Sequence, residues 1–320
     1  MKPWIIMRKG IQLNQLLEKR MILVVGSGII CGALFNNFFI AIKSWVPFLF
    51  AYITFALTIN CSFRDFKDVF KTPGSLLTIL GLLHIFLPLI ATVLARIFLP
   101  GQPLLQAGII LITAAPIGVA STMWTGIARG RVPLALTAVI ADTILSPLVV
   151  PLIMLMTIGH KVQFNVPSLM WGLAWMAVVP TILGMAVHDL TKGKASRNWK
   201  FITNPSSKIC LAIIIAVNLA AVWNKLEILK SSFSMTLALV FIMSCSGYLS
   251  GFICSRFFKL APDLTNTLIF TVGMRNNTAG LVLALNYFPE ITAIPVVFVI
   301  LFQQPLAALS LHLLASKNKS

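Results

Sequence analysis

The sequence predicts an all-α polytopic membrane protein with ten transmembrane helices, built as two inverted five-helix repeats whose fourth and ninth helices are broken and cross. Of its 320 residues, 58% are hydrophobic and 10% are charged, and the mean hydropathy is +0.94, values far from those of a soluble domain. The net charge of +17 is distributed between apolar segments rather than gathered on one face. This indicates membrane topology signals and argues against nucleic-acid binding.

Several functional classes find no motif in this chain. The five cysteines are odd in number and have no paired spacing, so we expect no disulfide framework. The sequence also lacks zinc-ligand spacings, a phosphate-binding loop and a serine–histidine–aspartate arrangement. We therefore expect no enzyme, no cofactor, no nucleic-acid partner and no obligatory protein partner. The expected partners are the lipid bilayer and a small solute.

The chain divides into a basic head and a helical membrane domain. Residues 1–20 mix lysine and arginine with apolar side chains, which predicts either an amphipathic helix on an anionic membrane surface or a disordered basic tail. Residues 21–320 contain apolar segments long enough to cross about 30 Å of hydrocarbon. The ten predicted spans are 21–41, 46–62, 74–98, 104–127, 133–158, 168–189, 208–223, 233–257, 264–288 and 291–315.

Positive charge predicts the orientation of these spans. An even number of spans places both termini on one side of the membrane. Of the 25 lysines and arginines, 19 lie in the termini and loops of that side, including a long basic loop at 190–208, five lie in the opposite loops, and Arg275 lies within a span. Because lysine and arginine are enriched in cytoplasmic loops, we predict a multi-pass protein of the cell membrane with both termini in the cytoplasm.

The two halves of the chain, about 21–160 and 165–315, each contain five spans and must therefore have opposite orientations. At an offset of about 159 residues, Val69-Phe70-Lys71 meets Ile228-Leu229-Lys230, and Pro116 meets Arg275. This alignment matches an interruption in the fourth span with one in the ninth. Paired interruptions of this kind are the best sequence pointer to a transporter's binding site.

Helix-breaking residues define the two interruptions: Pro116 and Gly118 in the fourth span, and Gly273 in the ninth. Half-helices that begin after such breaks direct amide donors and positive dipole ends to the crossing point, which suits an anionic ligand. The alternative for the fourth span is a kinked helix that only packs against a neighbour. The expected substrate-binding residues are Ser121, Thr122, Thr271, Arg275, Asn276 and Asn277.

Two further ionisable side chains lie inside predicted spans. Asp142 is the only carboxylate far inside an apolar segment and Arg275 is the only such arginine, so mutual pairing is the simplest way to neutralise both. The pair is either a coupling element or a fixed structural bridge, and the sequence leaves both open. His84 in the third span either relays protons or binds a ligand, or forms a hydrogen bond across a helix interface.

The chain resembles the bile acid:sodium symporter family at motifs spread over nearly its whole length. These motifs are Leu57-Thr58-Ile59, Asp65-Phe66, Lys71-Thr72-Pro73, Ala120-Ser121, Ala128-Arg129-Gly130, Leu145-Ser146-Pro147, and Gly273-Met274 followed by Asn276. The resemblance implies a ten-helix sodium symporter for organic anions. It also implies a panel domain of helices 1, 2, 6 and 7, a core domain of helices 3–5 and 8–10, and substrate bound between them.

The sodium sites that the resemblance implies are altered in this chain. Sodium-coupled members place a glutamate two residues before the Gly-Met pair and a glutamine directly after it, where this chain has Thr271 and Arg275. A third-helix glutamine aligns with Leu83 or His84, and the fourth-helix Ser-Asn pair reads Ser121-Thr122, the candidate residual sodium ligands. A guanidinium repels sodium and supplies the same charge. We therefore expect Arg275 to stand where one sodium would bind, and transport to be sodium-independent or linked to protons.

The sequence thus predicts a secondary transporter of a small or amphipathic organic anion, bile-acid-like or a monocarboxylate, that works by alternating access. One alternative is an intramembrane enzyme with Asp142 and His84 as acid and base, which requires the two side chains in reach of each other. Another is an anion-binding sensor that uses these residues and Arg275. A direct Asp142–Arg275 pair with His84 remote would favour the transporter.

Overall fold

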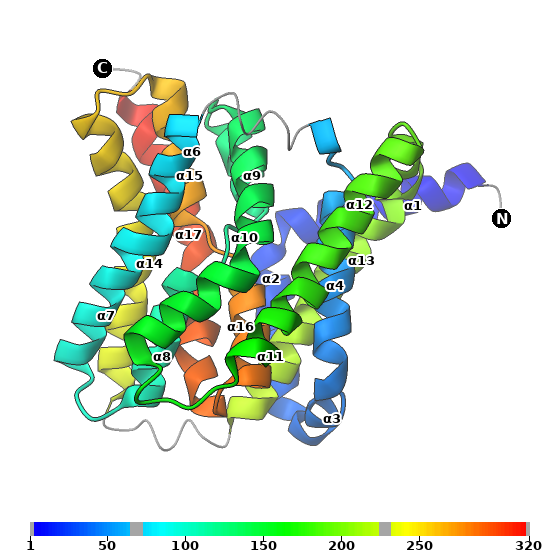
Figure 1. Cartoon of the computed structure of the whole chain (residues 1–320). Helices are drawn as coiled ribbons and strands as arrows, with labels where there is room; N and C mark the ends of the chain where they lie inside the picture. Colours follow the sequence, from blue (N-terminus) through cyan, green and yellow to red (C-terminus); the bar gives the residue numbers. More distant parts are fainter. Residues whose placement is uncertain (1–2, 65–72, 224–231, 318–320) are drawn as a thin grey trace. The chain divides into compact units, whose positions relative to one another are not determined.

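The computed structural model describes residues 3–64, 73–223 and 232–317, and all regular elements in these ranges are helices (Figure 1). Six helices there are long and apolar enough to cross a membrane, which confirms the predicted class of all-α polytopic membrane protein. These helices are Pro73–Phe98, Val132–Ile158, Val166–Leu190, Lys194–Trp223, Phe233–Phe257 and Glu290–Leu314. The motifs Asp65-Phe66 and Lys71-Thr72, and the matched triplets 69–71 and 228–230, lie outside the described residues.

The chain divides into two compact units. The first unit comprises Met1–Arg64 and Gly172–Asn224, and the second unit comprises Asp65–Trp171 and Lys225–Ser320. Helix α11 (Val166–Leu173) crosses the boundary between them.

Close helix packing holds the first unit together. Its elements are α1 (Pro3–Lys19), α2 (Met21–Leu34), α3 (Asn36–Ala41), η1 (Lys43–Trp45), α4 (Val46–Thr58), the π-helical η4 (Ala174–Val178), α12 (Val179–Leu190) and α13 (Lys194–Trp223). In α2, Gly28 and Gly32 face the backbone of α13, and a Cβ atom on Gly28 would lie 2.7 Å from the carbonyl oxygen of Ala212. Small residues at this spacing allow two helices to approach closely in a membrane.

The structure corrects two boundaries in the first unit. The basic loop expected at 190–208 is wrong, because α13 begins at Lys194 and continues through Pro205. Helix α1 packs against this extension: Gly10 lies so close to the backbone of Phe201 that a Cβ atom on Gly10 would overlap its carbonyl oxygen, and the Nζ atom of Lys208 at the end of the extension donates to Oδ1 of Asn14 at 2.5 Å. The single span expected at 21–41 is divided between α2 and α3 at Phe35. For the basic head, which the sequence left as helix or tail, the structure has helix α1.

The second unit contains two helices that are interrupted. Its elements are α6 (Pro73–Gly81), the π-helical η3 (Leu82–Phe86), α7 (Leu87–Phe98), α8 (Pro103–Ala114), α9 (Ala120–Ile127), α10 (Val132–Ile158), α14 (Phe233–Phe257), α15 (Pro262–Gly273), α16 (Asn277–Tyr287), η6 (Glu290–Thr292) and α17 (Ala293–Lys317). The predicted spans 104–127 and 264–288 correspond to α8–α9 and α15–α16. Proline occupies the first turn of α8, α10 and α15, where its missing amide is not needed.

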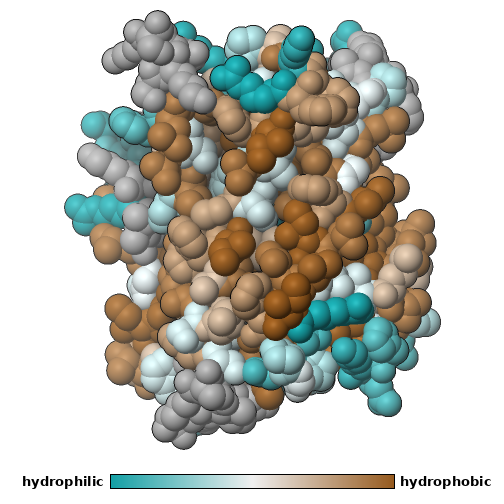
Figure 2. All heavy atoms as spheres, turned by 90° about the vertical axis from the view of Figure 1, so that its left-hand side faces the viewer, coloured by the Kyte–Doolittle hydropathy of each residue, from teal (hydrophilic) through white to brown (hydrophobic). Residues whose placement is uncertain are grey.

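Large apolar side chains lie exposed on the outer helices of the second unit. On α7 and α14 these include Leu89, Ile97, Leu249 and Ile253, each more than half exposed. In the face drawn in Figure 2, hydrophobic side chains dominate and hydrophilic ones lie mainly toward the edges. Soluble proteins rarely expose apolar surface of this extent, so this surface is suited to contact with lipid.

Candidate functional site

The two interrupted helices of the second unit meet at their breaks. Ile117 and Arg275 form an antiparallel β-bridge between the two segments. The amide of Gly118 donates to the carbonyl oxygen of Met274 at 2.9 Å, and the amide of Asn276 donates to that of Pro116 at 2.7 Å. Backbone groups that the helices leave unpaired are therefore satisfied across the crossing, as burial requires.

Glycine makes this close approach possible. A Cβ atom on Gly118 would lie 2.8 Å from the carbonyl oxygen of Arg275, a distance at which the opposing backbone would have to move. Gly273, where α15 ends, lies against the ring of Tyr248, which a Cβ atom would overlap. The structure thus places Pro116, Gly118 and Gly273 at the two breaks, where the sequence predicts them.

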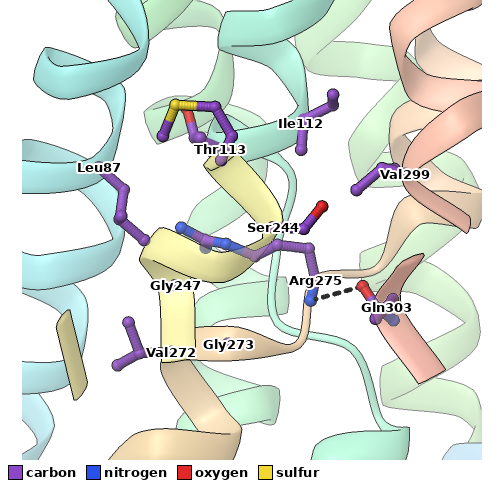
Figure 3. A pocket seen from close by; sticks show the side chains of 11 residues that line it. Leu87, Ile112, Thr113, Ser244, Gly247, Val272, Gly273, Arg275, Val299 and Gln303 are labelled. Carbon is purple, nitrogen blue, oxygen red and sulfur yellow. Dashed lines mark hydrogen bonds between the residues drawn. The ribbon is translucent and has the colours of Figure 1, made fainter. Parts of the chain in front are cut away.

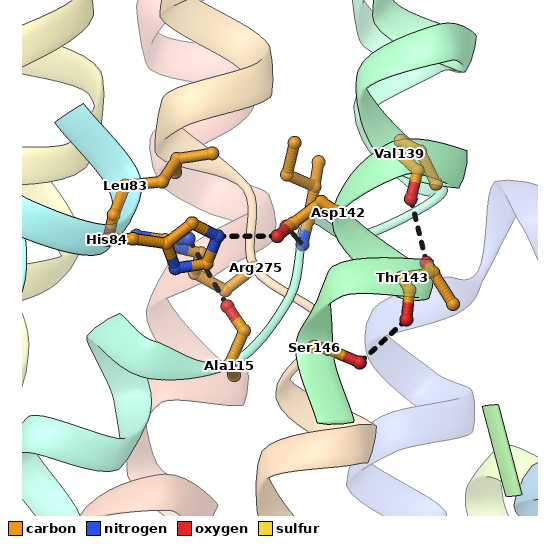
Figure 4. Close-up of polar contacts among 9 residues, drawn as sticks. Leu83, His84, Ala115, Val139, Asp142, Thr143, Ser146 and Arg275 are labelled. Atoms are coloured by element: carbon orange, nitrogen blue, oxygen red, sulfur yellow. Dashed lines mark hydrogen bonds and ion pairs between the residues drawn. The ribbon is translucent and has the colours of Figure 1, made fainter. Parts of the chain in front are cut away.

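Arg275 projects from the second break into the protein interior and is 5% exposed. Its Nη1 atom donates to the carbonyl oxygen of Ala115 at 3.2 Å, and its Nη2 atom donates to that of Leu83 at 3.1 Å (Figure 4). The guanidinium thus bridges the first break and the helix that contains η3. A buried cation requires such partners, because leaving it unpaired in an apolar interior is costly.

Local backbone irregularity makes both carbonyl oxygens available. In the π turn η3, the amide of Leu87 donates to the carbonyl oxygen of Leu82 rather than to that of Leu83. The next residue is Pro88, which has no amide proton, so the carbonyl oxygen of Leu83 is left for Arg275. Ala115 directly follows α8 as its C-terminal cap residue, and its carbonyl oxygen is likewise released from helical bonding.

Asp142 on α10 is fully buried, and its carboxylate has two partners. Oδ1 lies 2.5 Å from Nε2 of His84, and Oδ2 accepts a hydrogen bond from the amide of Ile117 at 2.6 Å (Figure 4). The carboxylate therefore satisfies an amide that the first break leaves without a helical partner.

The predicted direct pair between Asp142 and Arg275 is wrong: among the described residues, the ion-pair partner of Asp142 is His84. The physical reason is that each charged group has nearer partners: the guanidinium donates to two backbone carbonyl oxygens, and both oxygens of the Asp142 carboxylate are bound by His84 and by the amide of Ile117. The two charges are instead linked through the first break, because Arg275 binds the carbonyl oxygen of Ala115 and Asp142 binds the amide of Ile117. His84, Asp142 and Arg275 thus form one cluster, which we call the charged cluster.

Gln303 on α17 belongs to the site and is absent from the predicted residues. Its Oε1 atom accepts hydrogen bonds from the amide of Arg275 at 3.2 Å and from Nδ2 of Asn277 at 2.6 Å. Its carbonyl oxygen accepts the hydroxyl of Tyr248 at 2.9 Å. The pair Gln303-Gln304 inside a predicted span was the available signal, since amides at membrane depth are costly unless paired.

The predicted substrate-binding residues differ in what the structure leaves available. Thr271 and Thr122 donate their hydroxyls to carbonyl oxygens of their own helices, at 2.7 and 2.8 Å. Asn276 caps α16 by accepting the amide three residues later at 3.1 Å. Ser121 Oγ and Asn277 Oδ1 are buried and have no hydrogen-bond partner among the described residues. Ser121 and Asn277 therefore retain the capacity to bind a ligand or water, whereas the Thr271 hydroxyl is occupied within α15.

A cavity of about 20 Å³ lies beside Arg275 (Figure 3). Arg275, Gln303, Gly273, Thr113 and Ser244 contribute to its wall. Its size allows about one water molecule and is too small for an organic substrate. Among the described residues, no group of three or more histidine, cysteine, aspartate or glutamate side chains is arranged to hold a metal ion.

Interrupted membrane helices that cross at buried charged groups are the architecture of secondary transporters. The chain belongs to the sodium bile acid symporter family, whose family model matches residues 46–227. The family resemblance seen in the motifs is thereby confirmed.

Three relatives illustrate this membership. The chain is 34% identical to the uncharacterized protein YbaS of Bacillus subtilis (strain 168), over 90% of this chain and 94% of that protein. It is 25% identical to the uncharacterized sodium-dependent transporter YocS of the same organism, over 83% of this chain and 81% of that protein. It is 26% identical to the probable sodium/metabolite cotransporter BASS1, chloroplastic, of Oryza sativa subsp. japonica, over 72% of this chain and 56% of that protein.

Proposed function

We propose that this protein is a secondary active transporter that carries a small or amphipathic organic anion, bile-acid-like or a monocarboxylate, across the cell membrane by alternating access. Family membership supports transport, and two of the relatives are named as a sodium-dependent transporter and a sodium/metabolite cotransporter. The observation that carries the proposal is the buried guanidinium of Arg275 at the crossing of two interrupted helices. A fixed positive charge there favours an anionic substrate.

We assign the first unit to the panel domain and the second unit to the core domain of a ten-span inverted repeat. The division of the chain supports this, since the first unit holds the predicted spans 1, 2, 6 and 7. The antiparallel bridge between the two interrupted segments, one from each half of the chain, also supports it. Alternating access is then a movement of the core against the panel.

The proposed orientation has both termini in the cytoplasm. Arg131 Nε donates to Oδ2 of Asp263 at 2.6 Å, which brings together two loops of the second unit that the charge count assigns to the cytoplasm. Arg96 Nη2 donates to the carbonyl oxygen of Thr157 at 2.9 Å, which brings together two connections assigned to the opposite side. These two contacts agree with one orientation of the second unit.

We further propose that Arg275 replaces a coupling sodium ion. Sodium requires several convergent oxygen ligands, and the carbonyl oxygens of Ala115 and Leu83 are already bound by the guanidinium. The positive charge would in addition repel a cation at this position. Ser121 and Thr122 alone remain as candidate sodium ligands, and the Thr122 hydroxyl is bonded within its own helix.

Uptake into proteoliposomes tests this function. Radiolabelled taurocholate, pantoate and pyruvate are supplied with a sodium gradient or a pH gradient imposed separately, for wild type, Arg275→Gln and Arg96→Gln. The last variant is the matched control, since Arg96 is an exposed arginine that also donates to a backbone carbonyl. We expect wild type and control to transport at least one anion without sodium, and Arg275→Gln to lose transport. Uptake driven by sodium alone would contradict the assignment of Arg275.

The structure also bears on the enzyme alternative. His84 is not remote from Asp142, so the contact that an acid–base pair requires is present. However, neither side chain lines the cavity beside Arg275, and family membership favours transport. We therefore assign the His84–Asp142 contact to the transport mechanism rather than to catalysis.

A further inference from the structure

The hydrogen bond between His84 and Asp142 fixes which imidazole nitrogen carries a proton. A carboxylate only accepts hydrogen bonds, and Oδ2 of Asp142 is already bound to the amide of Ile117. Nε2 of His84, 2.5 Å from Oδ1, must therefore be the donor. Nδ1 of the neutral ring then carries a basic lone pair, and it is buried without a hydrogen-bond partner in the part of the chain that the structure describes.

An unpartnered basic nitrogen in a buried site needs a reason, since such an atom forfeits hydrogen bonding that water would provide. The His84 side chain is 9% exposed and that of Asp142 is fully buried. The carboxylate beside Nε2 is the group that would stabilise the imidazolium formed when Nδ1 takes up a proton. The arrangement thus offers one site for one proton.

Few other charged or titratable groups face this histidine. Besides Asp142 on α10 and Arg275 at the second break, the described elements in most extensive contact with η3 are α6, α7, α8 and α14. Helices α6 and α8 contain no titratable residue, and Arg96 on α7 is bonded to the carbonyl oxygen of Thr157. On α14, Tyr248 is bonded to Gln303, and the remaining groups are Cys245, Cys254 and Arg256. Among the described residues, Asp142 and Arg275 are therefore the charged groups bonded to His84 or to the residue before it.

We propose that Nδ1 of His84 binds the proton that is co-transported with the organic anion. The proposal rests on the transport function above and names its coupling ion. With His84 neutral, Arg275 and Asp142 cancel and the charged cluster has no net charge. When a proton from solution forms the Nδ1–H bond, the cluster gains one positive charge, which the carboxylate of a monovalent substrate compensates.

This charge balance couples one proton to one monovalent anion. An isolated charge is costly in an apolar interior, so the proton and the anion each favour binding of the other. The empty, deprotonated cluster is again neutral and returns without a bound ion. Movement of the two together carries no net charge for a monovalent anion.

The η3 turn links the proton site to the crossing. Leu83, the residue before His84, presents its carbonyl oxygen to Arg275 at 3.1 Å. Asp142 reaches the same crossing through the amide of Ile117. A change of charge on His84 is therefore felt at both interrupted helices through directly bonded groups.

The test compares wild type with His84→Gln and with His160→Gln, a control at an exposed position. The glutamine amide can still donate to Asp142 but has no basic nitrogen. Two readouts are made on proteoliposomes with whichever of taurocholate, pantoate or pyruvate the wild type carries: accumulation driven by a pH gradient, and exchange of labelled for unlabelled anion at equal pH. We expect His84→Gln to lose pH-driven accumulation at least tenfold and its residual exchange to be independent of pH, whereas exchange by wild type and His160→Gln should fall as pH rises.

Retention of pH-driven accumulation by His84→Gln would overturn the proposal. Failure of wild type to carry any of the three anions would instead count against the proposed function. A second measurement avoids dependence on one variant: uptake of protons by purified protein on addition of anion, followed with a pH-indicator dye. We expect about one proton per protein for wild type and His160→Gln, and less at the same pH for Asp142→Asn, which removes the stabilising carboxylate. Equal proton uptake by Asp142→Asn and wild type would also refute the assignment.

Discussion

Substitution of Arg275 by methionine should destabilise the second unit by about 2–6 kcal/mol, because two buried carbonyl oxygens each lose their donor at about 1–3 kcal/mol. These carbonyl oxygens are those of Ala115 and Leu83. The charge of Asp142 is in addition left without the nearby guanidinium. Methionine matches the volume closely, so a cavity contributes little.

The assay is equilibrium unfolding in detergent, followed by circular dichroism, for wild type, Arg275→Met and the control Arg96→Met. Arg96 also donates to a backbone carbonyl but is exposed, so its loss should cost less than about 1 kcal/mol. The destabilisation caused by Arg275→Lys should lie between those of Arg275→Met and Arg96→Met, because an ammonium group keeps the charge but cannot reach two carbonyl oxygens as the forked guanidinium does. Equal free energies of unfolding for Arg275→Met and Arg96→Met would refute the view that the guanidinium holds the crossing together.

Three further predictions concern other parts of the second unit. Gly118→Ala places a methyl group 2.8 Å from the opposing backbone and should lower the free energy of unfolding by about 1–3 kcal/mol. The control Gly81→Ala, which has open space around it, should not lower the melting temperature. The hydrogen bond to Arg131 lowers the pKa of Asp263. The small stabilisation of the folded protein by this pair is therefore present above about pH 4 and is lost as the pH falls through the pKa of Asp263 in the folded state. The melting temperatures of Asp263→Asn and wild type should converge in acid, and a difference that stays constant with pH would contradict this. Pro88→Ala introduces a backbone amide directly after the π turn η3. This amide can compete with Arg275 for the carbonyl oxygen of Leu83, so the variant should show weaker pH-driven uptake with an unchanged yield of folded protein.

The crossing was predictable from sequence because it is encoded locally. Pro116, Gly118 and Gly273 disrupt helices wherever they occur, and matched interruptions in two halves indicate where segments distant in sequence meet. The same reasoning brought Asp142 and Arg275 to one region, because isolated charges at membrane depth require neutralising groups.

The partners of these charges were not predictable. Arg275 binds two backbone carbonyl oxygens, and one of them is free only because η3 is a π turn. Side-chain identities alone do not report such a shift in backbone hydrogen bonding. The contribution of Gln303 depends on how α17 packs, and the extension of α13 to Lys194 depends on contacts with α1. Tertiary contacts decided each of these features.

The most direct test of the central claim, that Arg275 replaces a coupling sodium ion, is the melting temperature of purified protein in sodium chloride compared with potassium and choline chloride. It requires no knowledge of the substrate. We expect equal melting temperatures in the three salts for wild type. We also expect selective stabilisation by sodium for Thr271→Glu/Arg275→Gln, which restores the two family residues. Selective stabilisation of wild type by sodium would contradict the role assigned to Arg275.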